Sequence, residues 1–70
     1  MKISDAKTFG ETIRKRRKEL GYTQSFLAEF TGFSVSFISD LENGKVTVEL
    51  GRSIHIAQSL GLDISLSPRS

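Results

Sequence analysis

Residues 21–45 decide the fold of this chain, and they read GYTQSFLAEFTGFSVSFISDLENGK. Thr23 and Ser34 are residue types that cap helix N-termini, and each stands directly before a segment with helical apolar spacing. A glycine follows each segment and suits a helix C-terminus. We therefore predict two short helices, over about residues 24–31 and 35–43, joined by a link of about three residues.

The second of these helices is predicted to have two unlike faces. Ile38 and Leu41 share one side, which suits a core, with Phe37 at its edge. The opposite side carries short side chains in place of the long charged ones that a solvated surface helix usually has. Its members are Val35, Ser36, Ser39, Asp40 and Asn43. This face is therefore typical of a helix that lies close against another molecule.

Two short helices joined by a tight glycine-containing turn are typical of the helix-turn-helix motif of DNA-binding proteins. In that motif the second helix enters the major groove, which is about 12 Å wide, while the first crosses the DNA backbone. Short side chains on residues 35–43 would let this helix sit deep in the groove. We therefore predict that it is a recognition helix and that double-stranded DNA is its partner.

Further helices are predicted on each side of the motif. Ser4 is the expected N-cap of a helix over about residues 5–20, and Thr47 that of a helix over about residues 48–60. The apolar stripe of the first is Phe9, Ile13 and Leu20. The apolar stripe of the second is Leu50, Ile54, Ala57 and Leu60.

The last stretch of the chain alternates apolar and polar residues, as a β-strand does. The apolar residues are Leu62, Ile64 and Leu66, and Pro68 ends the pattern. Because one strand cannot satisfy its own backbone, we predict that it pairs with the same strand of a second copy. The chain is thus divided into a helix-turn-helix domain, residues 1–61, and a dimerisation strand with a tail, residues 62–70.

Length and composition limit the kinds of protein that this chain can be. Seventy residues, of which 37% are hydrophobic and 26% charged, predict a single globular domain with a thin core. With no cysteine, one histidine (His55) and no clustered carboxylates, we expect no metal site, no cofactor and no enzymatic activity. Since no segment suits a membrane span or a secretion signal, we expect no membrane partner and a location in the cytoplasm.

Basic residues cluster near the start of the chain. The net charge is only +2, yet residues 14–18 read RKRRK. Clustering matters more than the total charge for binding phosphates. The run is either a solvated helix face or a contact with the DNA backbone, and its composition favours neither.

The segments from Gly21 to Ala28 and from Ser34 to Lys45 resemble the phage repressor (Cro and Xre type) helix-turn-helix domains. The shared features are the Thr-Gln and Leu-Ala pairs, the turn glycine, the Ile-Ser-x-Leu-Glu run and the final Gly-Lys. With the C-terminal strand, the chain resembles HipB-type antitoxins. The resemblance implies an all-α fold of four to five helices, with one C-terminal β-strand pairing across a homodimer.

The same resemblance implies a transcriptional repressor. It implies that the dimer binds a palindromic operator, represses its own toxin–antitoxin operon and binds a toxin, for which a HipA-like kinase is one choice. A stand-alone or phage-type regulator without a toxin partner is the alternative.

The resemblance also implies roles for individual residues. Gln24 matches a glutamine that contacts a phosphate and braces the start of the recognition helix, and Arg17 matches an arginine that pairs with the glutamate at Glu42. The expected DNA contacts are Thr23, Gln24, Ser34, Val35, Ser36, Ser39, Asp40, Asn43 and Lys45. Many relatives carry glutamine or arginine at positions 35 and 36, whereas this chain has neither.

Asp40 is an unusual residue for a surface that approaches DNA. It suits three roles: accepting a hydrogen bond from a cytosine amino group, rejecting wrong sites by repulsion, or stabilising the helix as a solvent-facing charge. With short readers around it, DNA shape and half-site spacing are expected to contribute to specificity.

Phe26 and Phe30 lie four residues apart on the first helix of the motif. Two interpretations stay open: they extend the core or the dimer contact, or they form an exposed aromatic pair that binds a partner protein. Replacing both with serine separates these interpretations, because loss of folding indicates core packing and loss of partner binding alone indicates docking.

Overall fold

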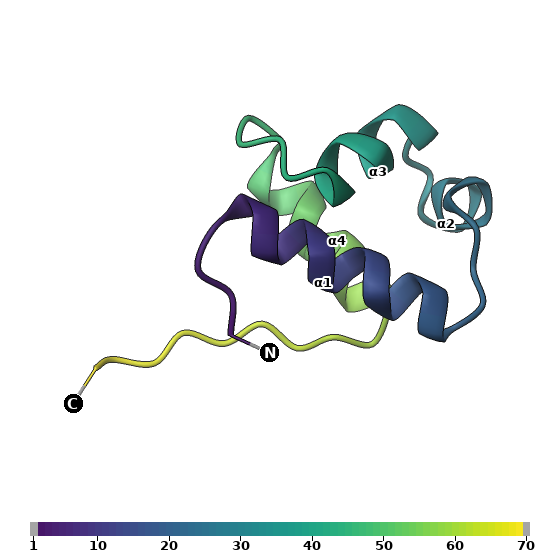
Figure 1. The fold of residues 1–70 in the computed structure, drawn as a ribbon. Helices are drawn as coiled ribbons and strands as arrows, with labels where there is room; N and C mark the ends of the chain where they lie inside the picture. Colours follow the sequence, from purple (N-terminus) through teal and green to yellow (C-terminus); the bar gives the residue numbers. More distant parts are fainter. Residues whose placement is uncertain (1, 70) are drawn as a thin grey trace.

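The computed structural model describes residues 2–69 and contains four helices among them (Figure 1). They are α1 (Ala6–Glu19), α2 (Gln24–Thr31), α3 (Val35–Glu42) and α4 (Leu50–Ser59). Figure 1 shows α1 crossing α4, with α3 on one side of the pair and α2 at one end. The expected helical fold is therefore confirmed for residues 2–69. Within this range, none of the helices has the length and apolar character needed to cross a membrane.

The helices close around one apolar core. Its largest fully buried side chains are Ile13, Leu27, Ile38, Leu41, Ile56 and Leu60. Full burial of one such side chain stabilises the fold by about 1.5–3 kcal/mol. Since Ile38 and Leu41 point inward as predicted, the opposite face of α3 is turned outward.

The N-cap of α1 is Asp5, so the expected cap at Ser4 is wrong. The backbone N–H of Thr8 donates to the Asp5 carboxylate at 2.8 Å, and the Thr8 hydroxyl accepts from the Asp5 N–H at 3.1 Å. This reciprocal capping box satisfies two donors at once, which the Ser4 side chain does not. The bond from the Thr8 N–H also lowers the pKa of Asp5 below its ordinary value.

The apolar stripe of α1 is shorter than predicted. Ile13 is buried and Phe9 is half-buried against the core, but Leu20 is the C-cap and is exposed. Arg16 lies on the same side of the helix, and its Nε donates to the carbonyl of Leu60 at 2.8 Å. The side chain of Arg16 therefore caps the C-terminal end of α4.

The helix α4 begins at Leu50, so the expected start at Val48 with Thr47 as its N-cap is wrong. Val48 lies in the preceding loop and packs against the core instead. Glu49 is the N-cap without a side-chain capping bond, and its carbonyl accepts from the Ser53 hydroxyl at 2.7 Å. Packing of the loop, rather than capping, decides where this helix starts.

The apolar stripe of α4 also differs from the prediction. Leu50 is 69% exposed, because it lies at the open end of the helix beyond the edge of the core, and Ile54 is only half-buried. Ile56, which was not expected on the stripe, is fully buried. Ala57 and Leu60 are buried as predicted.

No strand is present within residues 2–69, and residues 62–69 have no regular secondary structure. Leu62 is the anchored part of this tail, because its N–H donates to the carbonyl of Ala57 at 2.9 Å and its side chain packs on the core. Beyond Leu62 the tail passes the N-terminal residues and leaves the helical body (Figure 1). Pairing of this segment with a second chain therefore stays a prediction.

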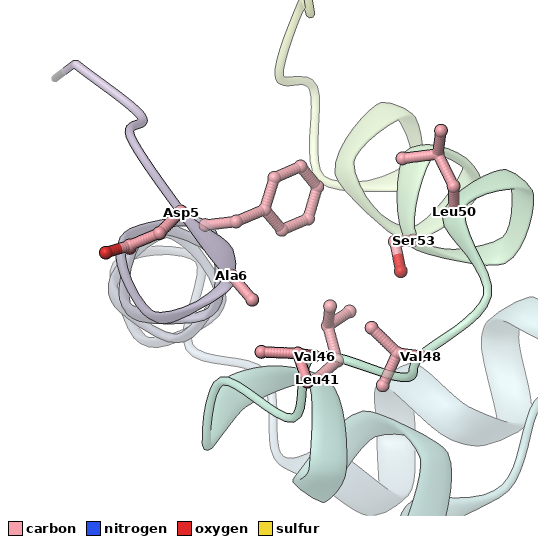
Figure 2. A pocket seen from close by; sticks show the side chains of 8 residues that line it. Asp5, Ala6, Leu41, Val46, Val48, Leu50 and Ser53 are labelled. Atoms are coloured by element: carbon pink, nitrogen blue, oxygen red, sulfur yellow. The ribbon is translucent and has the colours of Figure 1, made fainter.

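An open apolar pocket of about 290 Å³ lies where α1, α4 and the loop after α3 meet (Figure 2). Figure 2 shows Val46 and Val48 of that loop at the bottom of the opening, with Ala6 of α1 to their left and Leu50 of α4 above them, beyond Ser53. Val46 and Leu50 are largely exposed. The pocket therefore continues the apolar core to the surface.

Candidate nucleic-acid interface

The two motif helices begin at the predicted caps. The Thr23 hydroxyl accepts from the N–H of Phe26 at 3.0 Å, and the Ser34 hydroxyl accepts from the N–H of Phe37 at 3.0 Å. Gly32 ends α2 with φ of 81°, a left-handed conformation that residues with a Cβ rarely adopt. Residues 24–31 and 35–42 thus form the helix–turn–helix arrangement that the sequence predicts.

The outward face of α3 carries the expected short side chains. Val35 is 42% exposed, Ser36 and Asn43 are exposed, and Ser39 and Asp40 are half-buried. The Asn43 side-chain amide donates to the Ser39 hydroxyl at 3.4 Å. The structure therefore brings these five residues to one outward surface without a long side chain among them.

Asp40 and Lys45 form an ion pair of 3.4 Å beside this face. The backbone N–H of Lys45 also donates to the Asp40 carbonyl at 3.0 Å. The ammonium group and the carboxylate are each about half-exposed, so such a pair contributes only about 0–1 kcal/mol. The charge of Asp40 is nevertheless partly neutralised by Lys45 in the isolated chain.

Arg17 and Glu42 lie together beneath the motif. The Arg17 Nε and Nη2 donate to the two carboxylate oxygens of Glu42 at 2.6 and 2.9 Å, and Nη1 donates to the carbonyl of Tyr22 at 2.8 Å. Both side chains are almost fully buried. The hydrogen bond to Glu42 raises the pKa of Arg17 above its ordinary value, against the opposite effect of burial. This pair ties α1 to the last residue of α3 and to the loop before α2.

Gln24 joins the same network. Its side-chain Nε2 donates to Glu42 at 3.1 Å, so it braces the end of α3. The resemblance implies that it braces the start of this helix instead. An amide nitrogen carries a second hydrogen, which remains able to donate to a phosphate. Every buried side-chain polar atom within residues 2–69 has a hydrogen-bond partner, as the stability of such a network requires.

Phe26 and Phe30 do not belong to the core. Their side chains are 47% and 63% exposed, and their rings stack nearly parallel with centroids 6.0 Å apart. Tyr22 packs against Phe26 with a centroid distance of 4.8 Å. The interpretation that this pair extends the core of the single chain is therefore wrong. Two interpretations of Phe26 and Phe30 remain open: a contact between the two copies of a dimer, and binding of a partner protein.

Arg52 and His55 of α4 make local contacts near the motif. Arg52 of α4 pairs with Glu49 at 3.1 Å and lies 5.8 Å from the ring centre of Phe33, which also touches His55. Within residues 2–69, no three His, Cys, Asp or Glu side chains are grouped closely enough to bind a metal ion.

The structure adds Gly10 to the residues that matter for this surface. It is buried in the middle of α1, where it touches the end of α3. The sequence holds a signal for it, because an interior glycine in a helical pattern often marks a close backbone contact. The residues predicted from the sequence do not include Gly10, because the glycine alone does not show which backbone it touches.

Comparison with known proteins agrees with this geometry. The sequence profile of a family described as Helix-turn-helix matches residues 13–66. An uncharacterised HTH-type transcriptional regulator of Sinorhizobium fredii is 35% identical over 65 residues, which cover 93% of this chain and 86% of that protein. The ImmF control region 10 kDa protein of Bacillus phage phi105 is 32% identical, over 89% of this chain and 69% of that protein. The chain belongs to the helix-turn-helix family of the phage repressor (Cro/Xre) type.

Solved structures of HipB share the fold. HipB in a HipB–O4 20mer complex superposes with a TM-score of 0.88 at 30% identity, over 100% of this chain and 99% of that one. A HipA–HipB–O2–O3 complex gives the same TM-score and identity over the same shares. The predicted resemblance to HipB is therefore confirmed.

The buried ion pair generates a prediction about stability. Glu42→Ala leaves the Arg17 guanidinium buried without its partner, which is expected to lower the free energy of unfolding by about 3–5 kcal/mol. Urea unfolding followed by far-UV circular dichroism measures the change.

The control breaks an exposed pair instead. Glu19→Ala removes the Arg16–Glu19 contact of 3.7 Å and is expected to cost about 0–1 kcal/mol. The double variant Arg17→Met/Glu42→Leu should regain most of the stability, because no buried charge is then left unpaired. Similar losses for Glu42→Ala and Glu19→Ala would contradict the role given to the buried pair.

Proposed function

We propose that this chain is a sequence-specific transcriptional repressor that binds a palindromic operator as a homodimer. The observation that carries the proposal is the outward face of α3, which has only short side chains and which Arg17, Gln24 and Glu42 hold from beneath. Occupancy of the DNA, rather than chemistry, is the proposed mode of repression.

The proposed contacts divide into base readers and phosphate binders. Val35 suits a thymine methyl group, and the hydroxyls of Ser36 and Ser39 suit base-edge donors or acceptors. Asp40 suits a cytosine amino group, because Lys45 occupies only one of its two carboxylate oxygens. The proposed backbone contacts are Thr23, Gln24, Ser34, Asn43 and Lys45, and the N-terminal N–H groups of α2 add to them.

Selection of bound duplexes from random-sequence DNA tests this proposal. We expect a palindrome whose half-sites lie about one helical turn apart, and an affinity that falls steeply with salt. Ser36→Glu places a negative charge on the outward face of α3 and is expected to weaken binding about 10- to 100-fold or more. Electrophoretic mobility shift titration measures the affinity.

A matched variant adds the same charge elsewhere. Gln58→Glu lies at an exposed position of α4 and should change affinity by no more than about threefold, as expected for a charge away from the interface. Failure to recover any enriched sequence, or equal losses in the two variants, would contradict specific recognition through α3.

We propose further that the tail forms the dimer, which divides the chain into residues 1–61 and 62–70. Ile64 is partly exposed and Leu66 is 96% exposed, so their apolar surface is unburied in a single chain. They line a groove shared with Phe9 and Leu50, which borders the pocket of Figure 2. Pairing the tails of two copies would satisfy the strand backbone and cover this surface.

The dimer is tested by changing the exposed apolar residues while keeping Leu62, which packs on the core. Ile64→Ser/Leu66→Ser is expected to raise the dimer dissociation constant at least about 100-fold, because each copy loses the burial of two large side chains. Sedimentation equilibrium measures it. The control Ser65→Ala/Ser67→Ala alters the alternate positions and should leave the dimer intact, whereas unchanged dimerisation of the first variant would rule out the paired tail.

The proposed biological role is that of an antitoxin that controls its own operon and binds a toxin. The likeness to HipB in a HipA–HipB–O2–O3 complex supports this role, and a HipA-like kinase is the proposed partner. We assign the contact to Phe26 and Phe30, whose stacked rings lie exposed on α2. The likeness to a control-region protein of a Bacillus phage favours the second candidate, a regulator without a toxin.

The aromatic pair separates these two candidates. Phe26→Ser/Phe30→Ser is expected to keep the fold and operator binding but to lose binding to the product of the neighbouring gene, measured by co-purification. Ser25→Ala/Glu29→Ala, at neighbouring exposed positions of α2, serves as the control. If no neighbouring product binds the unmodified chain, the regulator without a toxin is the better description.

A further inference from the structure

Gly10 is an unfavourable residue for its position. It lies in the interior of α1, a helix of 14 residues, where glycine is about 1 kcal/mol less favourable than alanine. It is nevertheless buried, and its φ is not in the left-handed region that would explain a glycine. The reason for glycine here is therefore contact, not conformation.

That contact is with the backbone of α3. A Cβ on residue 10 would overlap the carbonyl oxygen of Leu41 and lie 2.9 Å from that of Glu42. The Glu42 carbonyl would have to retreat by about half an ångström to reach the 3.4 Å of ordinary contact, and the Leu41 carbonyl by more. Because these are backbone atoms, a side-chain rotation cannot relieve the overlap.

Two further contacts lie along the same side of α1. A Cβ on Gly44, two residues after the end of α3, would lie 2.9 Å from the Cα of Lys7. Arg17, two turns beyond Gly10, binds the Glu42 carboxylate. Lys7, Gly10 and Arg17 thus hold residues 41–44 from one helix face, and we call this contact the α1–α3 seam.

We propose that Gly10 is a positioning residue for DNA recognition, because its missing side chain sets the distance between α1 and the last turn of α3. The helix α3 is about 12 Å long, so a displacement of about 1 Å at one end tilts it by roughly 5°. Because the displaced end is that of residues 41–42, the tilt moves Ser39, Asp40 and Asn43 most relative to the DNA, where hydrogen bonds tolerate about half an ångström. The inference rests on the proposed DNA binding.

The test compares two glycine-to-alanine changes. Gly10→Ala inserts a methyl group into the α1–α3 seam. Gly51→Ala makes the same change inside α4, where the nearest heavy atom to the new Cβ is a side-chain oxygen of Glu49 at 3.6 Å. The control should be at least as stable as the parent, because alanine favours helices and has room there.

The decisive readout is the ratio of affinities for the selected duplex and for a random duplex, measured at one salt concentration. We expect Gly10→Ala to weaken binding of the selected duplex about tenfold or more. Binding of the random duplex should weaken by no more than about twofold, because contacts with DNA phosphates carry it. Simple loss of folded protein lowers the two affinities together and leaves the ratio unchanged. Gly51→Ala should keep the parent ratio.

A readout without DNA accompanies this measurement. In amide NMR spectra, Gly10→Ala should shift residues 41–45 more than residues 24–31, whereas Gly51→Ala should shift neither group. To secure folding, Gly10→Ala is also made in the Gly51→Ala background and measured at low temperature.

The outcomes separate the inference from the proposed function. A parent protein that does not discriminate between the two duplexes overturns the proposed function and the inference with it. A parent that discriminates, with an unchanged ratio in Gly10→Ala, overturns the inference alone. A Gly10→Ala chain that stays unfolded in the Gly51→Ala background also overturns it, because Gly10 is then a residue of stability.

Discussion

The guanidinium of Arg17 and the carboxylate of Glu42 meet under the recognition helix, and the geometry of the motif depends on this contact. An isolated helix of eight residues is not stable in water, so α3 needs tertiary contacts to hold its shape and direction. The ion pair supplies direction as well as attraction, because two parallel hydrogen bonds fix the relative orientation of the planar groups. Gln24 and the Tyr22 carbonyl satisfy the remaining polar atoms, which makes burial of the charges tolerable.

Much of the fold follows from local sequence signals, and the predictions for Thr47 and the tail that the single chain does not show concern segments whose structure depends on more distant contacts. Thr23 and Ser34 cap their helices as predicted, since a hydroxyl three residues before a free N–H is a purely local arrangement. Thr47 fails as a cap because it lies in a turn whose next residue, Val48, packs against the core, so α4 begins only at Leu50. The predicted strand in the tail cannot form in a single chain, because its backbone hydrogen-bond partners would belong to another copy.

The outward face of the candidate site was predictable from the sequence, whereas the contacts that support it from beneath were not all predictable. The outward position of Val35 and Ser36 follows from helical periodicity alone, once Ile38 faces inward. The contact of Gln24 with Glu42 does not, because residues 18 positions apart meet only through the packing of α2 on α3. The place of Gly10 against the backbone of α3 has the same origin: the sequence shows an odd glycine, and only the tertiary structure shows what it touches.

The pairing of Lys45 with Asp40 bears on the ion balance of the proposed DNA binding. A lysine that neutralises a phosphate normally displaces a condensed counterion, and the number displaced sets the salt dependence of affinity. Here the lysine is already paired with a carboxylate, so in the proposed complex Asp40 would exchange Lys45 for water, a cation or a donor from a base. If Asp40 takes up a cation, net ion release in the proposed complex is smaller than the number of phosphates touched. Counting basic side chains on this surface would then overestimate how strongly salt weakens the proposed complex.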